Sequence, residues 1–208
     1  MPGLSLQTEA FVLLKRPPSD RFQGCTVFSP EHGHLQVMQR IAQKTAATQA
    51  TLDLFDEVAL ILESSNQGQT WFVKETRLLH RPTGIGRSYE ALRQASAFAA
   101  LIARNRVAEE GRAAVGRLLQ QAIAAFATSD RPDLVYFKAL YAFARDEGYP
   151  VRQQWRPTLP ADLRATADLA LRTPLQALAP ADVPAARATL LIRRLEEYLR
   201  GHTEVLIE

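Results

Sequence analysis

The spacing of apolar residues changes near residue 80, and this change constrains the fold more than any other feature of the sequence. Before it, short runs of β-branched and aromatic residues lie between turn residues, and some of them alternate apolar and polar positions. Such a two-residue repeat is typical of half-buried strands. After Pro82, apolar residues recur every three or four positions, as on one face of a helix. The sequence therefore predicts a β-rich part followed by an α-helical part.

Five short strands are expected in the first part, separated by clusters of Pro, Ser, Asn, Asp and Gly. Ser64–Gly68 is such a cluster, and it indicates a hairpin between the last two strands. So many short strands in so few residues favour a small barrel over a sandwich. The expected strands are Phe11–Lys15, Phe22–Phe28, Leu35–Ile41, Val58–Glu63 and Gln69–Arg77.

The second part carries apolar stripes at helical spacing. Gly148 and Pro150 are typical of a helix end, so the third stripe is expected to stop there. The segment Val151–Pro180 holds four of the twelve prolines and is expected to be a linker with one short helix. The expected helices are Leu92–Ile102, Val115–Phe126, Asp130–Gly148 and Asp182–Arg200.

The composition is that of an ordinary globular chain, with 47% hydrophobic and 23% charged residues among 208. We expect an α+β organisation with a β-barrel domain at 1–80, a joint at 81–87 and an α-helical domain at 88–208. The apolar run 97–103 is shorter than a membrane span, and the first residues lack the pattern of a secretory signal. The expected location is therefore cytoplasmic, without membrane contact.

The residues that usually carry catalysis or bind metals form no recognisable motif. His32 and His34 are two positions apart, but no neighbouring ligand pattern completes a metal site, which favours a structural role over a metal site or general base. The single cysteine, Cys25, excludes an internal disulfide and is expected to be a buried, unreactive thiol. Gly84–Arg87 lacks the third glycine and the lysine of phosphate-binding loops. We expect no enzyme, metal or cofactor.

Basic residues are concentrated where the two parts meet. The span Arg77–Arg117 has eight arginines and three glutamates, so its local charge of +5 exceeds the +3 of the whole chain. A groove that follows phosphates requires such a concentration, and arginine is the base that suits phosphate best. The alternative, which charge alone supports equally, is that these arginines form the solvated faces of amphipathic helices.

Basic residues at the expected strand ends and loops of the barrel are candidate contacts for a DNA strand. Unpaired bases could stack on Phe22, Phe28 or Trp71, although aromatic residues at alternating strand positions more often belong to a core. The barrel segment is neutral through Arg81. The candidate DNA contacts are Lys15, Arg16, Arg21, Arg40, Lys44, Lys74, Arg77 and Arg81.

Several short segments, in their order along the chain, resemble the family of the bacterial recombination mediator RecO. In the barrel part these segments are TEAFVLLKR, VFSPEHGHLQV and LDLF. In the helical part they are DRPDLVYFKALYAFARDEGYPV and the terminal LIRRLEEYLRGHTEVLI. The similarity runs in the same order over nearly the whole chain.

The resemblance implies an OB-fold followed by a helical domain. It implies a DNA-binding protein of DNA repair and recombination that acts in the response to DNA damage, binds single- and double-stranded DNA, anneals complementary strands and assists loading of RecA onto DNA coated by single-strand binding protein. RecR and the C-terminal tail of the single-strand binding protein are the implied partners.

Two features depart from the family pattern. The four-cysteine zinc module that many members carry is replaced by the cysteine-free run 152–157, so no zinc is expected. The usually basic stretch after the third strand has only Arg40 and Lys44. The alternative function is a protein-interaction adaptor whose barrel is a scaffold without significant DNA binding.

Overall fold

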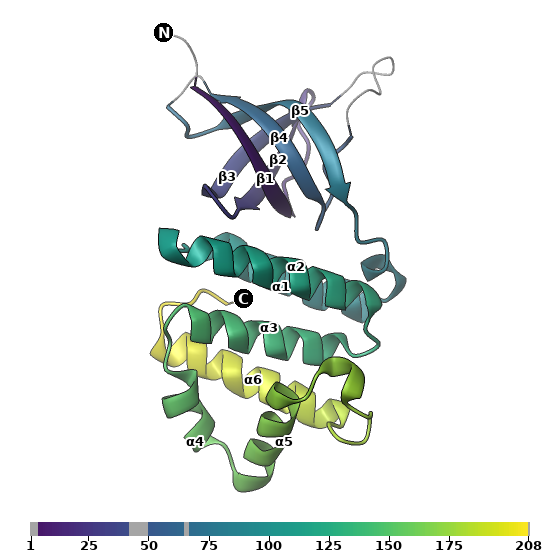
Figure 1. The fold of residues 1–208 in the computed structure, drawn as a ribbon, viewed down its shortest axis with the longest axis vertical. Coiled ribbons are helices and arrows are strands. Elements are labelled where there is room, and N and C mark those ends of the chain that lie inside the picture. The colour runs from purple at the N-terminus through teal and green to yellow at the C-terminus, as the bar shows by residue number, and fades with distance from the viewer. Residues whose placement is uncertain (1–3, 42–49, 65–66, 208) are drawn as a thin grey trace. The chain divides into compact units, whose positions relative to one another are not determined.

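The chain forms a closed five-stranded β-barrel followed by helices in a computed structural model that describes residues 4–41, 50–64 and 67–207 (Figure 1). The predicted barrel is confirmed, and each of the five expected strands is present. The strands are β1 (Leu4–Lys15), β2 (Phe22–Ser29), β3 (Gly33–Arg40), β4 (Glu57–Ser64) and β5 (Trp71–His80).

The strands follow one another around the barrel in the order β1-β2-β3-β5-β4. Neighbouring strands are antiparallel except β3 and β5, which run parallel. This parallel contact consists of two pairs, Val37 with Trp71 and Met38 with Phe72. Because successive side chains of a strand point to opposite faces, the first pair faces the barrel core and the second faces outward.

Alternation along the strands produces the barrel core. On β3, Leu35 and Val37 are buried, whereas His34, Gln36 and Met38 between and beside them are only partly covered. Burial also raises the pKa of the inward-facing Cys25 thiol to about 11, so the thiolate is scarce near neutral pH, as expected for an unreactive cysteine. The buried core comprises Ala10, Val12, Cys25, Val27, Leu35, Val37, Leu52, Val58, Leu60, Leu62 and Trp71.

The chain divides into two compact units, which differ from the expected domains. The first unit joins Met1–Pro82 to Ile102–Leu119, and the second joins Thr83–Leu101 to Gln120–Glu208. The helices α1 (Tyr89–Arg104) and α2 (Arg112–Thr128) are therefore each shared between the units.

Within the first unit, the segment Ile102–Leu119 packs against the turn between β2 and β3. The ring nitrogen Nε2 of His34 lies 2.7 Å from the carbonyl oxygen of Ile102. A Cβ atom at Gly116 would lie 2.7 Å from the ring of Pro30, so glycine is required there by close packing. These contacts cover one end of the outer β2–β3 surface.

The second unit contains most of the remaining helical residues. The segment predicted to be mainly linker is more helical than expected: it holds a π-helical turn at Val151–Trp155 and a twelve-residue helix at Ala161–Arg172. Three of its four prolines, Pro157, Pro160 and Pro174, lie at or just before helix starts, where a missing N–H costs nothing, and Pro180 lies in a turn. None of the four therefore interrupts a helix. The helices beyond α2 are α3 (Pro132–Asp146), α4 (Arg156–Thr158), α5 (Ala161–Arg172) and α6 (Ala185–His202).

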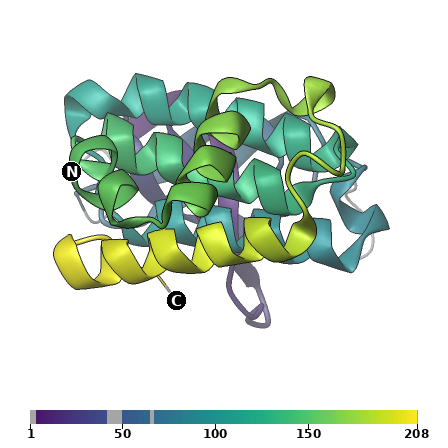
Figure 2. The ribbon, with the colours of Figure 1, turned by 90° about the horizontal axis from the view of Figure 1, so that it is seen from below.

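Helices α3 and α5 both pack against α6, which is the yellow helix in Figure 2. The Tyr136 hydroxyl donates to Glu196 Oε1 at 2.9 Å and links α3 to α6. Trp155 is buried against Phe137 and Tyr141, which makes the predicted linker part of this core. No described helix has both the length and the apolar character that a membrane span needs.

The predicted joint contains a short 3₁₀ helix at Ile85–Arg87, whose Ile85 side chain is buried. A Cβ atom on Gly84 would lie only 1.9 Å from the carbonyl oxygen of Ala127. The glycine is therefore explained by close approach to α2 within the second unit rather than by a need for a flexible backbone.

Candidate nucleic-acid interface

One part of the outer barrel surface combines aromatic rings with arginines. We call it the barrel patch, and it lies where the end of β1, the start of β2, the end of β3 and the start of β5 meet. Strand pairing aligns Phe22 with Arg40, and Met38 with Phe72, on the outward face. The barrel patch consists of Arg16, Arg21, Phe22, Met38, Arg40 and Phe72.

The aromatic part of the barrel patch is a pair of half-buried rings. The ring centroids of Phe22 and Phe72 are 5.6 Å apart with an interplanar angle of 70°, an edge-to-face arrangement. Gly24 adds no side chain beside them, and a Cβ there would be in ordinary van der Waals contact with the sulfur of Met38 at 3.4 Å and with Arg16 at 3.5 Å. The result is a low apolar surface on which an unpaired base could stack.

The arginines of the barrel patch are not neutralised by carboxylates in the described parts of the chain. Arg16 Nη2 donates to the amide oxygen of Gln36 at 2.8 Å, which orients the guanidinium and leaves its charge intact. Arg21 and Arg40 are exposed, and neither has an ion pair among residues 4–41, 50–64 and 67–207. Asp20 is the acid in the same turn as Arg21, so the three arginines and Asp20 together have a net charge of +2.

Three of the other predicted contacts are held in ion pairs with carboxylates. Lys74 Nζ is 2.7 Å from Glu63 Oε2, a pair between exposed side chains of β5 and β4. Lys15 Nζ donates to Asp53 Oδ1 at 2.9 Å, and this bond holds the pKa of the Asp53 carboxyl below its ordinary value.

The third ion pair is the most buried. Arg81 donates to both carboxylate oxygens of Asp56, from Nε at 2.8 Å and from Nη2 at 2.6 Å. Asp56 is fully buried, and its hydrogen bonds with Arg81 raise the pKa of the guanidinium. Arg81 also donates to the carbonyl oxygen of Thr51 at 2.9 Å. This pair fixes the connection that precedes β4.

The remaining two predicted contacts lie elsewhere. Arg77 is exposed on β5 opposite Ala59, five residues beyond Phe72, which corresponds to about 17 Å along a strand. Lys44 lies outside the described residues. The structure thus leaves Arg16, Arg21 and Arg40 of the barrel patch without carboxylate partners in the described chain, whereas Lys15, Lys74 and Arg81 are ion-paired and Arg77 lies further along β5.

Two of the three predicted stacking residues are part of the interior. Phe28 is fully buried and packs edge-to-face on His34, and Trp71 is 9% exposed within the barrel core. The prediction that bases stack on them is wrong, because neither ring offers a free face. Sequence reasoning missed Phe72, although its position beside Trp71 on a strand requires that one ring face inward and the other outward.

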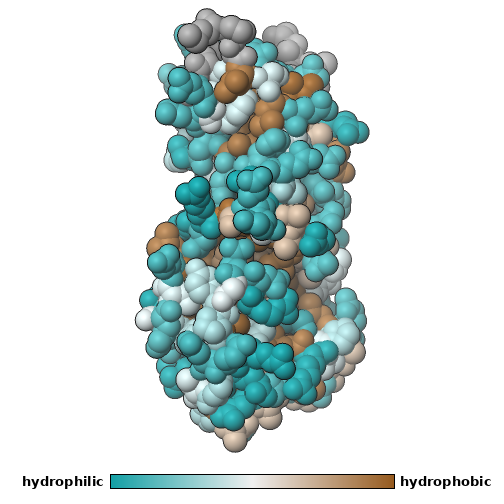
Figure 3. Space-filling model, turned by 60° about the vertical axis from the view of Figure 1, so that its left-hand side comes forward, coloured by the Kyte–Doolittle hydropathy of each residue, from teal (hydrophilic) through white to brown (hydrophobic). Residues whose placement is uncertain are grey.

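Exposed apolar side chains on the barrel are not confined to the barrel patch. Figure 3 shows apolar groups at several places on the barrel surface among hydrophilic ones. Leu4, Ile41 and Leu78 are exposed, and Ile41 follows Arg40 directly. The distinguishing property of the barrel patch is therefore the combination of rings and unneutralised arginines, not the apolar character alone.

The basic span between the barrel and the helices is divided between the two compact units. Arg93, in the second unit, makes a two-point ion pair with Glu90. Four of its arginines lie in the helical segment of the first unit, namely Arg104, Arg106, Arg112 and Arg117.

His34 and His32 both contact groups within the first unit. His34 is half-buried, and burial lowers the pKa of its ring, so the neutral form is favoured and its N–H donates to Ile102. His32, two positions before, is in contact with Glu31 at 3.5 Å. Within the described residues, no group of three or more His, Cys, Asp or Glu side chains has the proximity needed to hold a metal ion.

Comparison with known proteins adds no family to this description. No protein-family model matches the chain, and no curated protein is significantly similar to it.

Proposed function

We propose that this chain is a RecO-like mediator of DNA repair and homologous recombination, and that its barrel is an OB-fold that binds single-stranded DNA through the barrel patch. The observation that carries the proposal is the combination of half-buried, outward-facing aromatic rings with arginines that lack carboxylate partners in the described chain. OB-folds bind oligonucleotides on the outer face of their second and third strands and on the loops beside it. Phe22, Met38 and Arg40 occupy the corresponding strands here.

The barrel patch matches the two parts of sequence-independent binding to single strands. Stacking on an aromatic ring contributes about 1–3 kcal/mol per base, and basic side chains follow the phosphates. Phe22 and Phe72 supply the rings, and Arg16, Arg21 and Arg40 supply the charges. The resemblance extends this binding to annealing of complementary strands and to loading of RecA, with RecR and the tail of single-strand binding protein as partners.

The proposal is tested with Arg40→Glu and a matched variant, Arg77→Glu. Both arginines are exposed strand residues without a carboxylate partner in the described chain, but only Arg40 lies in the barrel patch. Fluorescence anisotropy of a labelled single-stranded oligonucleotide is measured at about 50 and 200 mM salt, where phosphate contacts lose most affinity. We expect Arg40→Glu to weaken binding about tenfold for all base sequences alike and to reduce the salt slope by about 0.7.

Two results would contradict this proposal. If the wild-type protein binds no oligonucleotide at the lower salt concentration, the barrel has no nucleic-acid role. If Arg77→Glu weakens binding as much as Arg40→Glu, general electrostatic attraction accounts for it and the barrel patch is not the site.

A second candidate function is a protein-interaction adaptor with the barrel as scaffold. The observation that favours it lies at the start of α1, where Tyr89 is 80% exposed and Leu92 is 40% exposed. Exposed aromatic residues are enriched in protein interfaces. An adaptor would show no steep dependence of oligonucleotide binding on salt, and Tyr89→Ala would abolish capture of its partner while leaving the fold unchanged.

A further inference from the structure

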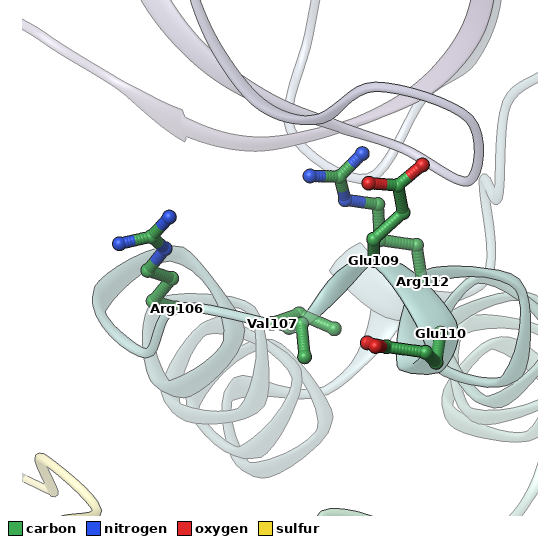
Figure 4. Close-up of a pocket in the computed structure, with 6 residues that line it drawn as sticks. Arg106, Val107, Glu109, Glu110 and Arg112 are labelled. Atoms are coloured by element: carbon green, nitrogen blue, oxygen red, sulfur yellow. The ribbon is translucent and has the colours of Figure 1, made fainter.

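A pocket of about 410 Å³ lies beside the connection between α1 and α2 in the first unit. Its volume is within the range of small-ligand sites. In Figure 4 the side chains of Arg106, Glu109 and Arg112 point to one side, and the carboxylate of Glu110 points toward Val107. The lining residues are Arg106, Val107, Ala108, Glu109, Glu110 and Arg112.

Most charged groups of the pocket lack an ion-pair or hydrogen-bond partner within the described chain. Arg106, Glu109 and Glu110 have no ion pair among the residues that the structure describes. Arg112 is held at the β2–β3 turn, because its Nη1 donates to the carbonyl oxygen of Glu31 at 3.1 Å. Its Nε is buried without any acceptor in the described chain, which is unusual for a buried donor.

The mixed charges of the lining disfavour ligands with a net charge of either sign. A phosphate or an acidic peptide would meet two carboxylates, and a cation would meet two guanidinium groups. Val107 is buried and provides an apolar floor, so a flat neutral group with both donors and acceptors on its edge fits the whole lining. A nucleobase is such a group.

Guanine fits this set of donors and acceptors best. Its N1–H and N2 amino group lie side by side and can donate to one carboxylate, such as that of Glu110. Its O6 and N7 atoms accept from a guanidinium, which is the commonest specific contact of arginine with a base. Adenine and cytosine offer the carboxylate one amino group, and thymine offers it one ring N–H.

We propose that this pocket receives one unpaired guanine of a DNA strand bound on the barrel patch, an inference that rests on the proposed function. The two sites share the β2–β3 surface: the barrel patch lies at Phe22, and six residues further along β2, Phe28 pairs with His34, which bonds to Ile102. Six strand residues span about 20 Å. At the 3.4 Å spacing of a stacked strand, this is about six nucleotides.

The test uses oligo-dT of about twelve nucleotides, within the size range of strands bound by such barrels. A single guanine is moved along the strand, and each oligonucleotide is titrated by anisotropy. We expect one favoured position at which the guanine tightens binding at least about fivefold, as for one good two-point contact. Hypoxanthine at that position, which lacks the N2 amino group, should lose most of the gain.

The variant Glu110→Gln should remove the gain from guanine and leave the affinity for plain oligo-dT within about twofold. Glu75→Gln, a change of an exposed glutamate on β5, is the matched control and should keep the gain. An equal effect of guanine at every position would overturn the pocket proposal, and so would an unchanged gain in Glu110→Gln.

A rise in affinity for every oligonucleotide in Glu110→Gln, without dependence on guanine, would mean that the pocket takes phosphate and would also overturn it. In all these cases the binding of plain oligo-dT keeps the proposed function intact. Absence of binding to plain oligo-dT is the different result that rejects the proposed function itself.

Discussion

The first unit uses cationic side chains in two ways on one barrel. At the barrel patch, Arg21 and Arg40 are exposed and unneutralised in the described chain. In the connection that precedes β4, Asp53 and Asp56 instead accept hydrogen bonds from Lys15 and Arg81, respectively. The first group is available to an anionic ligand, and the second group is committed to holding the chain.

A β-bulge explains why Lys15 belongs to the second group. The pairing of β1 with β2 shifts between Val12 and Leu14, so Lys15 pairs with the inward-facing Cys25. Lys15 is therefore directed to the barrel end, where Asp53 lies, and Arg16 is the next residue to face outward. One extra residue in a strand thus decides which of two adjacent cations can contact a ligand.

The largest expected effect is on stability, at the ion-paired end. Asp56→Ala removes the acceptor of two Arg81 hydrogen bonds and of the Asp53 backbone N–H. Because Asp56 is fully buried but Arg81 is half exposed, we expect unfolding in urea to require about 2–3 kcal/mol less free energy. Affinity for oligonucleotide per folded molecule should be unchanged. If Asp56→Ala instead weakened oligonucleotide binding without lowering stability, the ion-paired cations would not differ in role from those of the barrel patch.

A smaller effect is expected on affinity, at the aromatic part of the barrel patch. Phe72→Ala removes one stacking surface and should weaken oligonucleotide binding by about 1–2 kcal/mol, measured by anisotropy at low salt. Leu78→Ala is the matched control, because Leu78 is an exposed apolar residue further along the same strand. Equal losses in both variants would indicate that stacking at Phe72 is not the cause.

The smallest effect concerns the covered end of the β2–β3 surface. Burial lowers the pKa of His34 in the folded state, so the unfolded chain binds more protons when the pH falls below about 6.5. The stability that the neutral ring contributes is present above that pH and is lost as the pH falls toward the folded pKa. Urea midpoints at pH 7.5 and 5.5 should differ less in His34→Gln than in the wild type. His32→Gln leaves His34 in place and should retain the wild-type difference.

The sequence predicts the elements of this fold well and their environments less well. The alternation at Leu35–Ile41 and the punctuation around Gly148 place β3 and the end of α3 close to their observed limits. Local patterns of this kind arise from the neighbours of a residue along the chain. The helix α5 was not expected at its full length, because prolines at helix starts resemble prolines that break helices when only their number is considered.

The candidate site depends on information that the sequence does not contain. Whether Lys15 or Arg16 is free depends on a bulge, and whether Phe28 or Phe22 is exposed depends on which end of β2 the segment Ile102–Leu119 covers. Ion pairs such as Arg81 with Asp56 join residues 25 positions apart. The sequence therefore could not divide the eight predicted cations into exposed and ion-paired groups.

The barrel closes through only two residue pairs between β3 and β5, and the barrel patch lies on this contact. Met38 and Phe72, which form the outward pair, lie on the two sides of the seam that closes the barrel. A ligand stacked across both residues connects the two sides and is lost when they part. Occupancy of the surface and closure of the barrel are therefore linked, so a bound strand should slow amide hydrogen exchange along this seam more than elsewhere in the sheet.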